Sequence, residues 1–152
     1  MKKITEILNE KCIILNSELN DKDDIIEALV ELAAKSGNIT NTSKVLEEVF
    51  SRENLMSTGI GNNIAIPHTK SEDIKELTAS LITLSKPVNF DSLDGKKVSI
   101  VFLILSNNEE LGLHIKALSK ISRILHNRSF FEDMLNVSKN TEVIELFDNF
   151  EN

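Results

Sequence analysis

The chain has 152 residues, of which 41% are hydrophobic and 27% are charged, and its formal net charge at pH 7 is −7. This length fits one domain spanning residues 1–152, and the net negative charge argues against a nucleic-acid partner, whose phosphates require clustered lysines and arginines. The longest apolar run, Val98–Leu105, is too short to span a bilayer, and the first residues lack the apolar core of a signal peptide. We therefore expect a cytoplasmic protein with no membrane insertion.

In the first third of the chain we expect one strand and two helices, at residues 12–15, 21–35 and 42–53. The strand is a short apolar run that begins with Cys12, the only cysteine, which we expect to be a buried and inert thiol. The first helix has apolar residues at helical spacing, Asn20 or Asp21 as its N-cap, and Gly37 just beyond its end. The second helix carries Arg52 in its last turn.

The rest of the chain alternates apolar runs of strand length with helical patterns. We expect strands at residues 64–66, 77–84 and 98–105, and helices at residues 109–126, 130–135 and 141–150. The segment Lys86–Asn89 is predicted to break the second of these strands, and Asp94-Gly95 to form a turn. The run Val98–Leu105 is apolar on both faces, which is typical of a central strand. These elements predict an α/β sandwich with a central mixed β-sheet flanked by helices.

The segment from Gly59 to Thr69 carries the clearest chemical signal. An apolar run ends in Pro67 and is followed directly by His68. Because proline fixes φ and lacks an N–H, we expect the strand to stop there and to hold the His68 imidazole at its end. A neutral imidazole has one nitrogen with a free lone pair and can act as a nucleophile. Main-chain N–H groups near Gly59 and Gly61, together with Arg52, are the groups that a phosphate would require.

The stretch from Arg52 to His68 resembles the signature of the fructose/mannitol-type enzyme IIA domains of the bacterial sugar phosphotransferase system, including the nitrogen-regulatory branch. The stretch from Leu113 to Leu125 resembles the second block of that family, so the resemblance covers nearly the whole chain. Asn63 stands where the family often has glycine, and asparagine tolerates the positive φ that such a loop needs. Thr69 replaces a residue that is usually small.

The resemblance implies a reaction and its partners. His68 would accept phosphate from the phosphorylated histidine-containing carrier protein and pass it to a cysteine of a IIB partner, which serves a membrane IIC permease. An alternative is a regulatory protein whose phosphorylated and free forms bind different targets. The sequence does not name the sugar.

Three further residues have both a chemical and a structural interpretation. His114 lies on the predicted apolar stripe Leu111, His114, Leu118, Ile121 and Leu125, where a histidine is usually a core residue, but the resemblance implies that it assists His68. Arg52 is either a charge at a helix end or a phosphate contact, and Thr58 either binds phosphate or stabilises the loop. His126 is expected at a solvated helix end. The three histidines lack the spacing of zinc ligands, so we expect neither a metal nor an organic cofactor.

Overall fold

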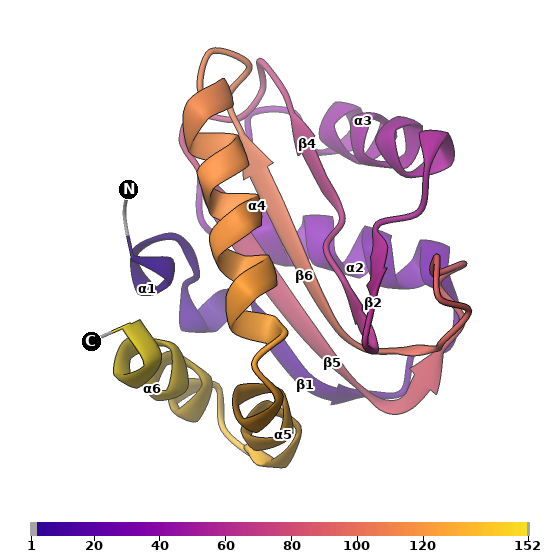
Figure 1. The fold of residues 1–152 in the computed structure, drawn as a ribbon. Coiled ribbons are helices and arrows are strands. Elements are labelled where there is room, and N and C mark those ends of the chain that lie inside the picture. Colours follow the sequence, from indigo (N-terminus) through magenta and orange to yellow (C-terminus); the bar gives the residue numbers. More distant parts are fainter. Residues whose placement is uncertain (1–2, 152) are drawn as a thin grey trace.

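The computed structural model describes residues 3–151, which form one mixed β-sheet with helices on both faces (Figure 1). The helices are α1 (Ile4–Ile7), a 3₁₀ turn η1 (Glu10–Cys12), α2 (Lys22–Ala34), α3 (Thr42–Leu55), α4 (Leu111–Leu125), α5 (Arg128–Asn136) and α6 (Asn140–Glu151). The strands are β1 (Ile13–Ser17), β2 (Gly59–Gly61), β3 (Ile64–Ala65), β4 (His68–Lys70), β5 (Thr78–Val88) and β6 (Val98–Ser106). No helix within residues 3–151 is long and apolar enough to cross a bilayer.

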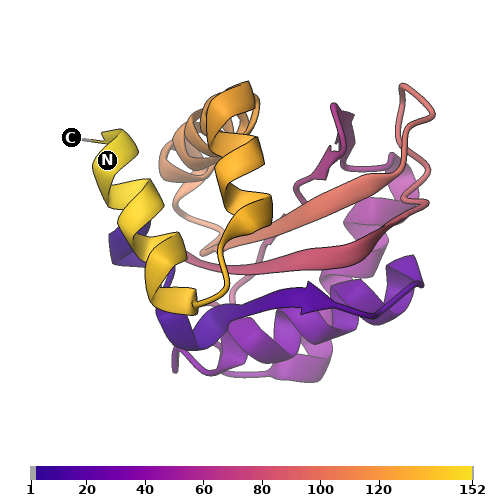
Figure 2. The same ribbon diagram turned by 90° about the horizontal axis from the view of Figure 1, so that it is seen from below.

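The strand order is β1-β5-β6-β3-β2, and β4 also pairs with β6. The pair β5–β6 is antiparallel, whereas β6 runs parallel to both β3 and β4. Figure 2 shows the sheet between two layers of helices, with α2 and α3 on one side and α4, α5 and α6 on the other. The predicted α/β sandwich with a central mixed sheet is confirmed.

The central strand β6 divides the core into two halves. All of its residues are buried, and because successive side chains in a strand point to opposite faces, they alternate between two clusters. Ile100, Phe102 and Ile104 pack with the layer of α4, whereas Val101, Leu103 and Leu105 pack with the layer of α2 and α3. The central position expected for this apolar run is confirmed.

The prediction that Lys86–Asn89 breaks a strand is wrong, since β5 continues to Val88. The physical reason is a change of register between β5 and β6, which pair at Thr83↔Ile100 and then only at Val88↔Val98. The neighbouring strand β1 has ended at Ser17↔Leu84 by this point. Pro87 therefore lies where no sheet hydrogen bond needs its missing N–H.

Several predicted boundaries shift by one or two residues. Cys12 ends η1 instead of opening the strand, and its thiol is buried as expected, with burial raising the pKa. Asp21 is the N-cap of α2, because its side chain accepts a hydrogen bond from the Asp24 N–H at 3.1 Å. Gly37 follows that helix with a φ of +81°. The short elements α1, β2 and β4 were not predicted from the sequence.

Candidate functional site

The glycine-bearing segment is a β-hairpin formed by β2 and β3. Asn62 and Asn63 link the two strands with φ values of 55° and 71°, the left-handed pair that a tight two-residue turn requires. The expected tolerance of Asn63 for positive φ is therefore confirmed. Gly59 is fixed by space, because a Cβ at this position would come 2.2 Å from the hydroxyl oxygen of Ser92.

The expectation that the strand stops at Pro67 is confirmed, since β3 ends at Ala65 and a separate strand, β4, begins at His68. The carbonyl of Pro67 accepts a hydrogen bond from the Ile104 N–H at 3.0 Å, so proline keeps its place beside β6 without an N–H of its own. His68 then pairs with Ile104 in parallel register. Paired residues of neighbouring strands share a face, so His68 lies on the α4 side of the sheet.

The imidazole of His68 has a defined tautomer. Its Nδ1 lies 2.9 Å from the carbonyl oxygen of Ile66, and because a carbonyl only accepts hydrogen bonds, Nδ1 carries the proton. In the neutral ring the lone pair therefore resides on Nε2. Burial lowers the pKa of His68, and the hydrogen bond to the Ile66 carbonyl opposes part of this effect. The charge of Arg52 lowers the pKa by a smaller amount, and that of Glu53 raises it. His68 is thus a neutral base with Nε2 available.

His114 lies in the first turn of α4, with its ring centroid 5.4 Å from that of His68. Its Nδ1 is 2.6 Å from the hydroxyl oxygen of Ser106. Burial lowers the pKa of His114 to about 4, and the charges of His68, Lys70 and Arg52 add to this effect. The second histidine is therefore both a core residue and a neighbour of the first, which joins the two interpretations that the sequence left open.

The predicted stripe on this helix is wrong at its first member. Leu111 is 52% exposed, and Leu118 is only partly buried. Ala117 and Ile124 are buried instead. The helix thus turns a slightly different face to the sheet, and its first turn presents apolar side chains to solvent. His126 is exposed at the C-terminal end, as expected.

Arg52 lies in the last turn of α3, where its Nη1 donates to the carbonyl of Met56 at 3.0 Å. It thus occupies the helix-end position that was one of its two interpretations, while its charge still contributes to the lowered pKa of both His68 and His114. The Thr58 hydroxyl is buried and donates to the Glu53 carboxylate. This contact corresponds to the loop-stabilising interpretation of Thr58.

Glu53 connects three segments around the site. Its side chain is 5% exposed and accepts hydrogen bonds from both the backbone N–H and the hydroxyl of Thr58. Lys22, at the start of α2, lies 3.0 Å from the same carboxylate and also covers the ring of Phe90. The carboxylate therefore holds the end of α3 against the residue that precedes β2.

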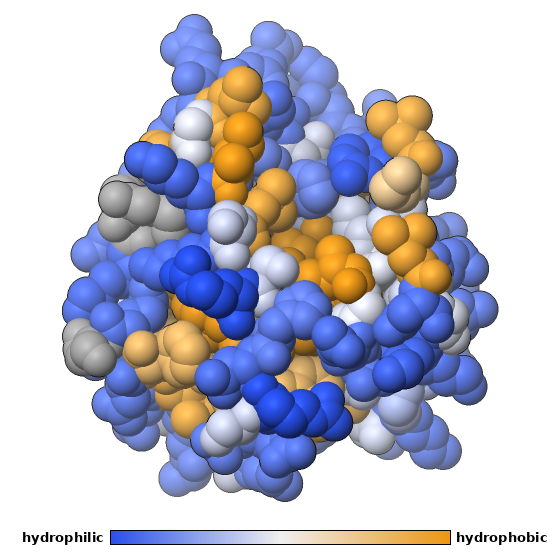
Figure 3. All heavy atoms as spheres, in the orientation of Figure 1, coloured by the Kyte–Doolittle hydropathy of each residue, from blue (hydrophilic) through white to orange (hydrophobic). Residues whose placement is uncertain are grey.

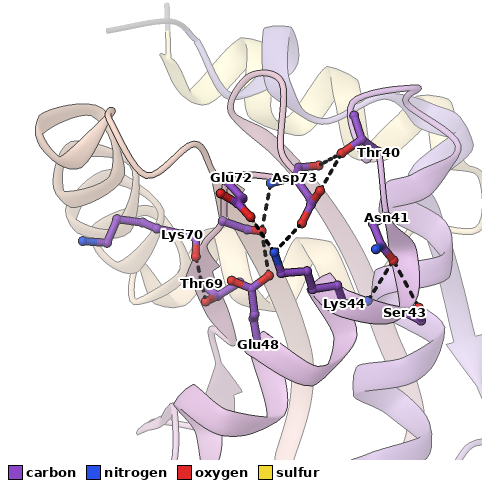
Figure 4. Close-up of polar contacts among 10 residues, drawn as sticks. Thr40, Asn41, Ser43, Lys44, Glu48, Thr69, Lys70, Glu72 and Asp73 are labelled. Atoms are coloured by element: carbon purple, nitrogen blue, oxygen red, sulfur yellow. Dashed lines mark hydrogen bonds and ion pairs between the residues drawn. The ribbon is translucent and has the colours of Figure 1, made fainter.

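A second polar cluster supports the turn after β4 (Figure 4). Lys44 forms ion pairs with Glu72 at 2.6 Å and Asp73 at 3.3 Å, and Ser71 donates to Glu48 at 2.7 Å. The side chain of Lys70 points away from this cluster. Since its charge contributes to the lowered pKa of His114, Lys70 is a second cation within reach of the histidines.

Exposed apolar side chains form a rim on the helix that carries His114, on α3 and on the hairpin. Leu111 and Ile115 are exposed on α4, Leu55 and Met56 at the end of α3, and Ile60 on the hairpin. Figure 3 shows apolar patches over these elements on the face that carries the site. Such a rim is typical of a surface that contacts another protein.

Sequence reasoning missed Ser106, Glu53 and Lys70. Ser106 is the polar end of an otherwise apolar run, and Lys70 shares strand parity with His68, so both had a weak signal. The groups present suit a phosphate-like anion, since His68 has a basic Nε2 and the charges of Arg52 and Lys70 act on the histidine pair. Among residues 3–151, no group of three or more His, Cys, Asp or Glu side chains could hold a metal ion.

Known proteins place these features in one family. The family model described as "Phosphoenolpyruvate-dependent sugar phosphotransferase system, EIIA 2" matches residues 6–150. The fructose-specific EIIABC component of Bacillus subtilis is 31% identical over 95% of the chain, but the chain spans only 23% of that protein. The nitrogen regulatory protein of Bradyrhizobium diazoefficiens is 33% identical over 93% of the chain and 91% of its own length.

Solved structures agree with this placement. The crystal structure of the nitrogen regulatory protein IIA-Ntr from Neisseria meningitidis superimposes with a TM-score of 0.88 and 34% identity, covering 95% of this chain and 98% of that one. Mannitol IIA from Escherichia coli shares the fold, with a TM-score of 0.77 at 23% identity over 91% of this chain and 97% of its own. The chain therefore belongs to the EIIA 2 family of the phosphoenolpyruvate-dependent sugar phosphotransferase system.

Proposed function

We propose that the chain is a phosphocarrier that accepts a phosphoryl group on Nε2 of His68 and passes it to a cysteine of a IIB partner for sugar uptake. The donor is the phosphorylated histidine-containing carrier protein. The observation that carries this proposal is the hydrogen bond from His68 Nδ1 to the Ile66 carbonyl. This bond leaves Nε2 as the one basic nitrogen of a neutral ring.

The proposed transfer exchanges one N–P bond for another. The Nε2 lone pair of His68 attacks phosphorus, an N–P bond forms, and the N–P bond of the donor imidazole breaks with its electron pair returning to the donor nitrogen. The ring of His68 gains positive charge in this step, and the Nδ1–H bond to the Ile66 carbonyl becomes a charge-assisted and stronger one. In the second step a cysteine thiolate of the partner attacks phosphorus, and Nε2 leaves with its lone pair.

The surrounding charges suit a phosphoryl group in transit. Arg52 and Lys70 act electrostatically on the histidines, so both would favour a dianion on His68. The Arg52 guanidinium is also held by the Met56 carbonyl, which limits how tightly it can clamp a phosphate. The half-buried position of His68, within an apolar rim, leaves the site open to a protein donor and a protein acceptor.

A second function is supported by the similarity to nitrogen regulatory proteins. The chain is 33% identical to the nitrogen regulatory protein of Bradyrhizobium diazoefficiens and 34% identical to the IIA-Ntr structure from Neisseria meningitidis. A regulatory protein would use the same phosphorylated His68 as a switch. The added negative charge would change which target proteins bind beside the apolar rim.

A two-step transfer assay separates the two functions. The phosphorylated carrier protein loads His68, the donor is removed, and candidate IIB domains are added while the label is followed. The phosphocarrier function predicts transfer to a IIB cysteine within seconds. If no IIB domain accepts the label and a non-transport protein binds only one phosphorylation state, the regulatory function is correct.

The chain supplies its own control. His126 also places Nδ1 beside a backbone carbonyl, at 2.7 Å from Ser122, but it is exposed at the far end of α4. His126→Ala should therefore label like the wild type, and His68→Ala should not label. Equal labelling of both variants would refute the assignment of His68.

A further inference from the structure

Among residues 3–151, Ser106, the last residue of β6, has the only hydroxyl that contacts either imidazole of the site. It is 0% exposed and lies in strand phase with Ile100, Phe102 and Ile104, whose side chains face the α4 layer. Its hydroxyl oxygen is 2.6 Å from His114 Nδ1. A buried contact this short fixes how the ring of His114 is held.

The direction of this hydrogen bond follows from burial. Within residues 3–151, His114 Nδ1 is the only hydrogen-bond partner of the Ser106 hydroxyl. If Nδ1–H donated to the serine oxygen, the serine proton would be buried without an acceptor, which proteins avoid. The hydroxyl therefore donates and Nδ1 accepts. In a neutral ring the proton must then reside on Nε2.

The backbone of Ser106 pairs with β4, the strand that carries His68. Ser106 pairs with Lys70 in the parallel β4–β6 ladder, and its carbonyl accepts from the Ser71 N–H at 2.9 Å. One residue thus fixes both the strand that carries His68 and the ring orientation of His114. The distance of 5.4 Å between the two ring centroids depends on both connections.

We propose that Ser106 is a positioning residue that holds His114 in the Nε2–H tautomer, so that His114 serves as a neutral hydrogen-bond donor to the phosphoryl group on His68. This role rests on the proposed phosphocarrier function. The opposite tautomer would turn a lone pair toward phosphate oxygens and repel them. A neutral donor stabilises the phosphoryl group less than an imidazolium, which suits a group that must leave again. The lowered pKa of His114 keeps the ring neutral at pH 7.

The direct test is the tautomer of His114 in the unphosphorylated protein. Long-range ¹H–¹⁵N correlation spectra of uniformly ¹⁵N-labelled wild type should show His114 as the Nε2–H form at pH 7. In Ser106→Ala the two tautomers should mix. A wild-type protein with His114 in the Nδ1–H form would overturn the proposal, and this measurement needs no variant to fold.

The functional test compares two buried serines. Phosphoryl acceptance by Ser106→Ala should be about five- to tenfold slower, because one hydrogen bond to the phosphoryl group is lost in part of the molecules. Ser106→Thr keeps the hydroxyl and should restore the rate and the tautomer. Ser80→Ala is the matched control, since Ser80 is equally buried and donates to the Leu29 carbonyl at 2.7 Å, away from the histidines.

The outcomes distinguish this proposal from the proposed function. Unchanged tautomer and unchanged rate in Ser106→Ala would overturn the role of Ser106 while His68 still accepts phosphate. A wild-type protein that shows the Nε2–H tautomer of His114 but takes no label on His68 would instead overturn the phosphocarrier function. Equal slowing in Ser106→Ala and Ser80→Ala, with no change of tautomer, would assign the effect to lost packing and refute the positioning role.

Discussion

Removing the carboxylate of Glu53 should destabilise the protein far more than removing an exposed one. The side chain is 5% exposed and faces three donors, which are the N–H and hydroxyl of Thr58 and the ammonium of Lys22. Glu53→Ala leaves both donors of Thr58 buried without acceptors, while Lys22 keeps only the longer ion pair with Asp91 at 3.7 Å. Breaking one side of a buried, hydrogen-bonded ion pair costs about 3–5 kcal/mol.

Glu53→Gln should give an intermediate loss of about 1–3 kcal/mol, because a carboxamide offers one acceptor oxygen where three donors converge. The assay is urea unfolding at pH 7, with free energies compared at constant slope. Glu132→Ala is the control, since Glu132 forms an exposed ion pair with Arg128 and should change stability by less than about 1 kcal/mol. A loss below about 1 kcal/mol in Glu53→Ala would show that the carboxylate does not hold α3 against the segment before β2.

Three further outcomes are expected. Arg52→Lys should slow phosphoryl transfer about ten- to a hundredfold with folding intact, because an ammonium cannot fork onto two phosphate oxygens, and a rate equal to wild type would contradict this. In an NMR pH titration His68 should titrate below 6.5 and His114 near 4. Because the unfolded chain then binds these protons at higher pH than the folded protein, the free energy of unfolding should fall as the pH drops from 6.5 toward 4, by up to about 1.4 kcal/mol per pH unit for each proton. A midpoint at or above 6.5 for either ring would contradict the effect of burial on the two histidines. Gly59→Ala should cost about 1–3 kcal/mol in urea unfolding, because its Cβ would meet a serine hydroxyl at 2.2 Å, whereas Gly112→Ala, with nothing within 4 Å, should cost nothing; equal stability of the two variants would contradict the packing at the hairpin.

Local patterns predicted the elements that depend on local physics. Three features could be predicted from the local sequence, namely the N-cap at Asp21, the glycine after α2 and the apolar run of β6. Capping, a positive φ and burial on both faces of a strand each restrict which residue types can occur at a position. Pro67 follows the end of β3, as expected, and its carbonyl accepts a hydrogen bond from the Ile104 N–H. The expectation that Pro87 breaks a strand was wrong, because no neighbouring strand needs its N–H there. Both arrangements depend on tertiary contacts, which the local sequence does not show.

The candidate site was predictable in part for the same reason. His68 and Arg52 stood out through their motif, and His114 through the resemblance of Leu113–Leu125 to the second block of the family. Ser106 and Glu53 did not stand out, because their roles depend on partners that only the fold brings close. Ser106 contacts Nδ1 of His114, which lies in another layer, and Glu53 contacts Lys22 on a different helix. A hydroxyl at a strand end becomes informative only when the ring that it contacts is known.

The proposed function depends most directly on which nitrogen of which histidine takes the phosphate. The chain should be loaded by the phosphorylated carrier protein, mapped by mass spectrometry under alkaline conditions because phosphohistidine is acid-labile, and then examined by ³¹P and ¹⁵N NMR. The hydrogen bond from Nδ1 to the Ile66 carbonyl predicts a single phosphohistidine at Nε2 of His68, and no label in His68→Ala. Phosphate on Nδ1 of His68, phosphate on His114, or undiminished labelling of His68→Ala would contradict the proposed function.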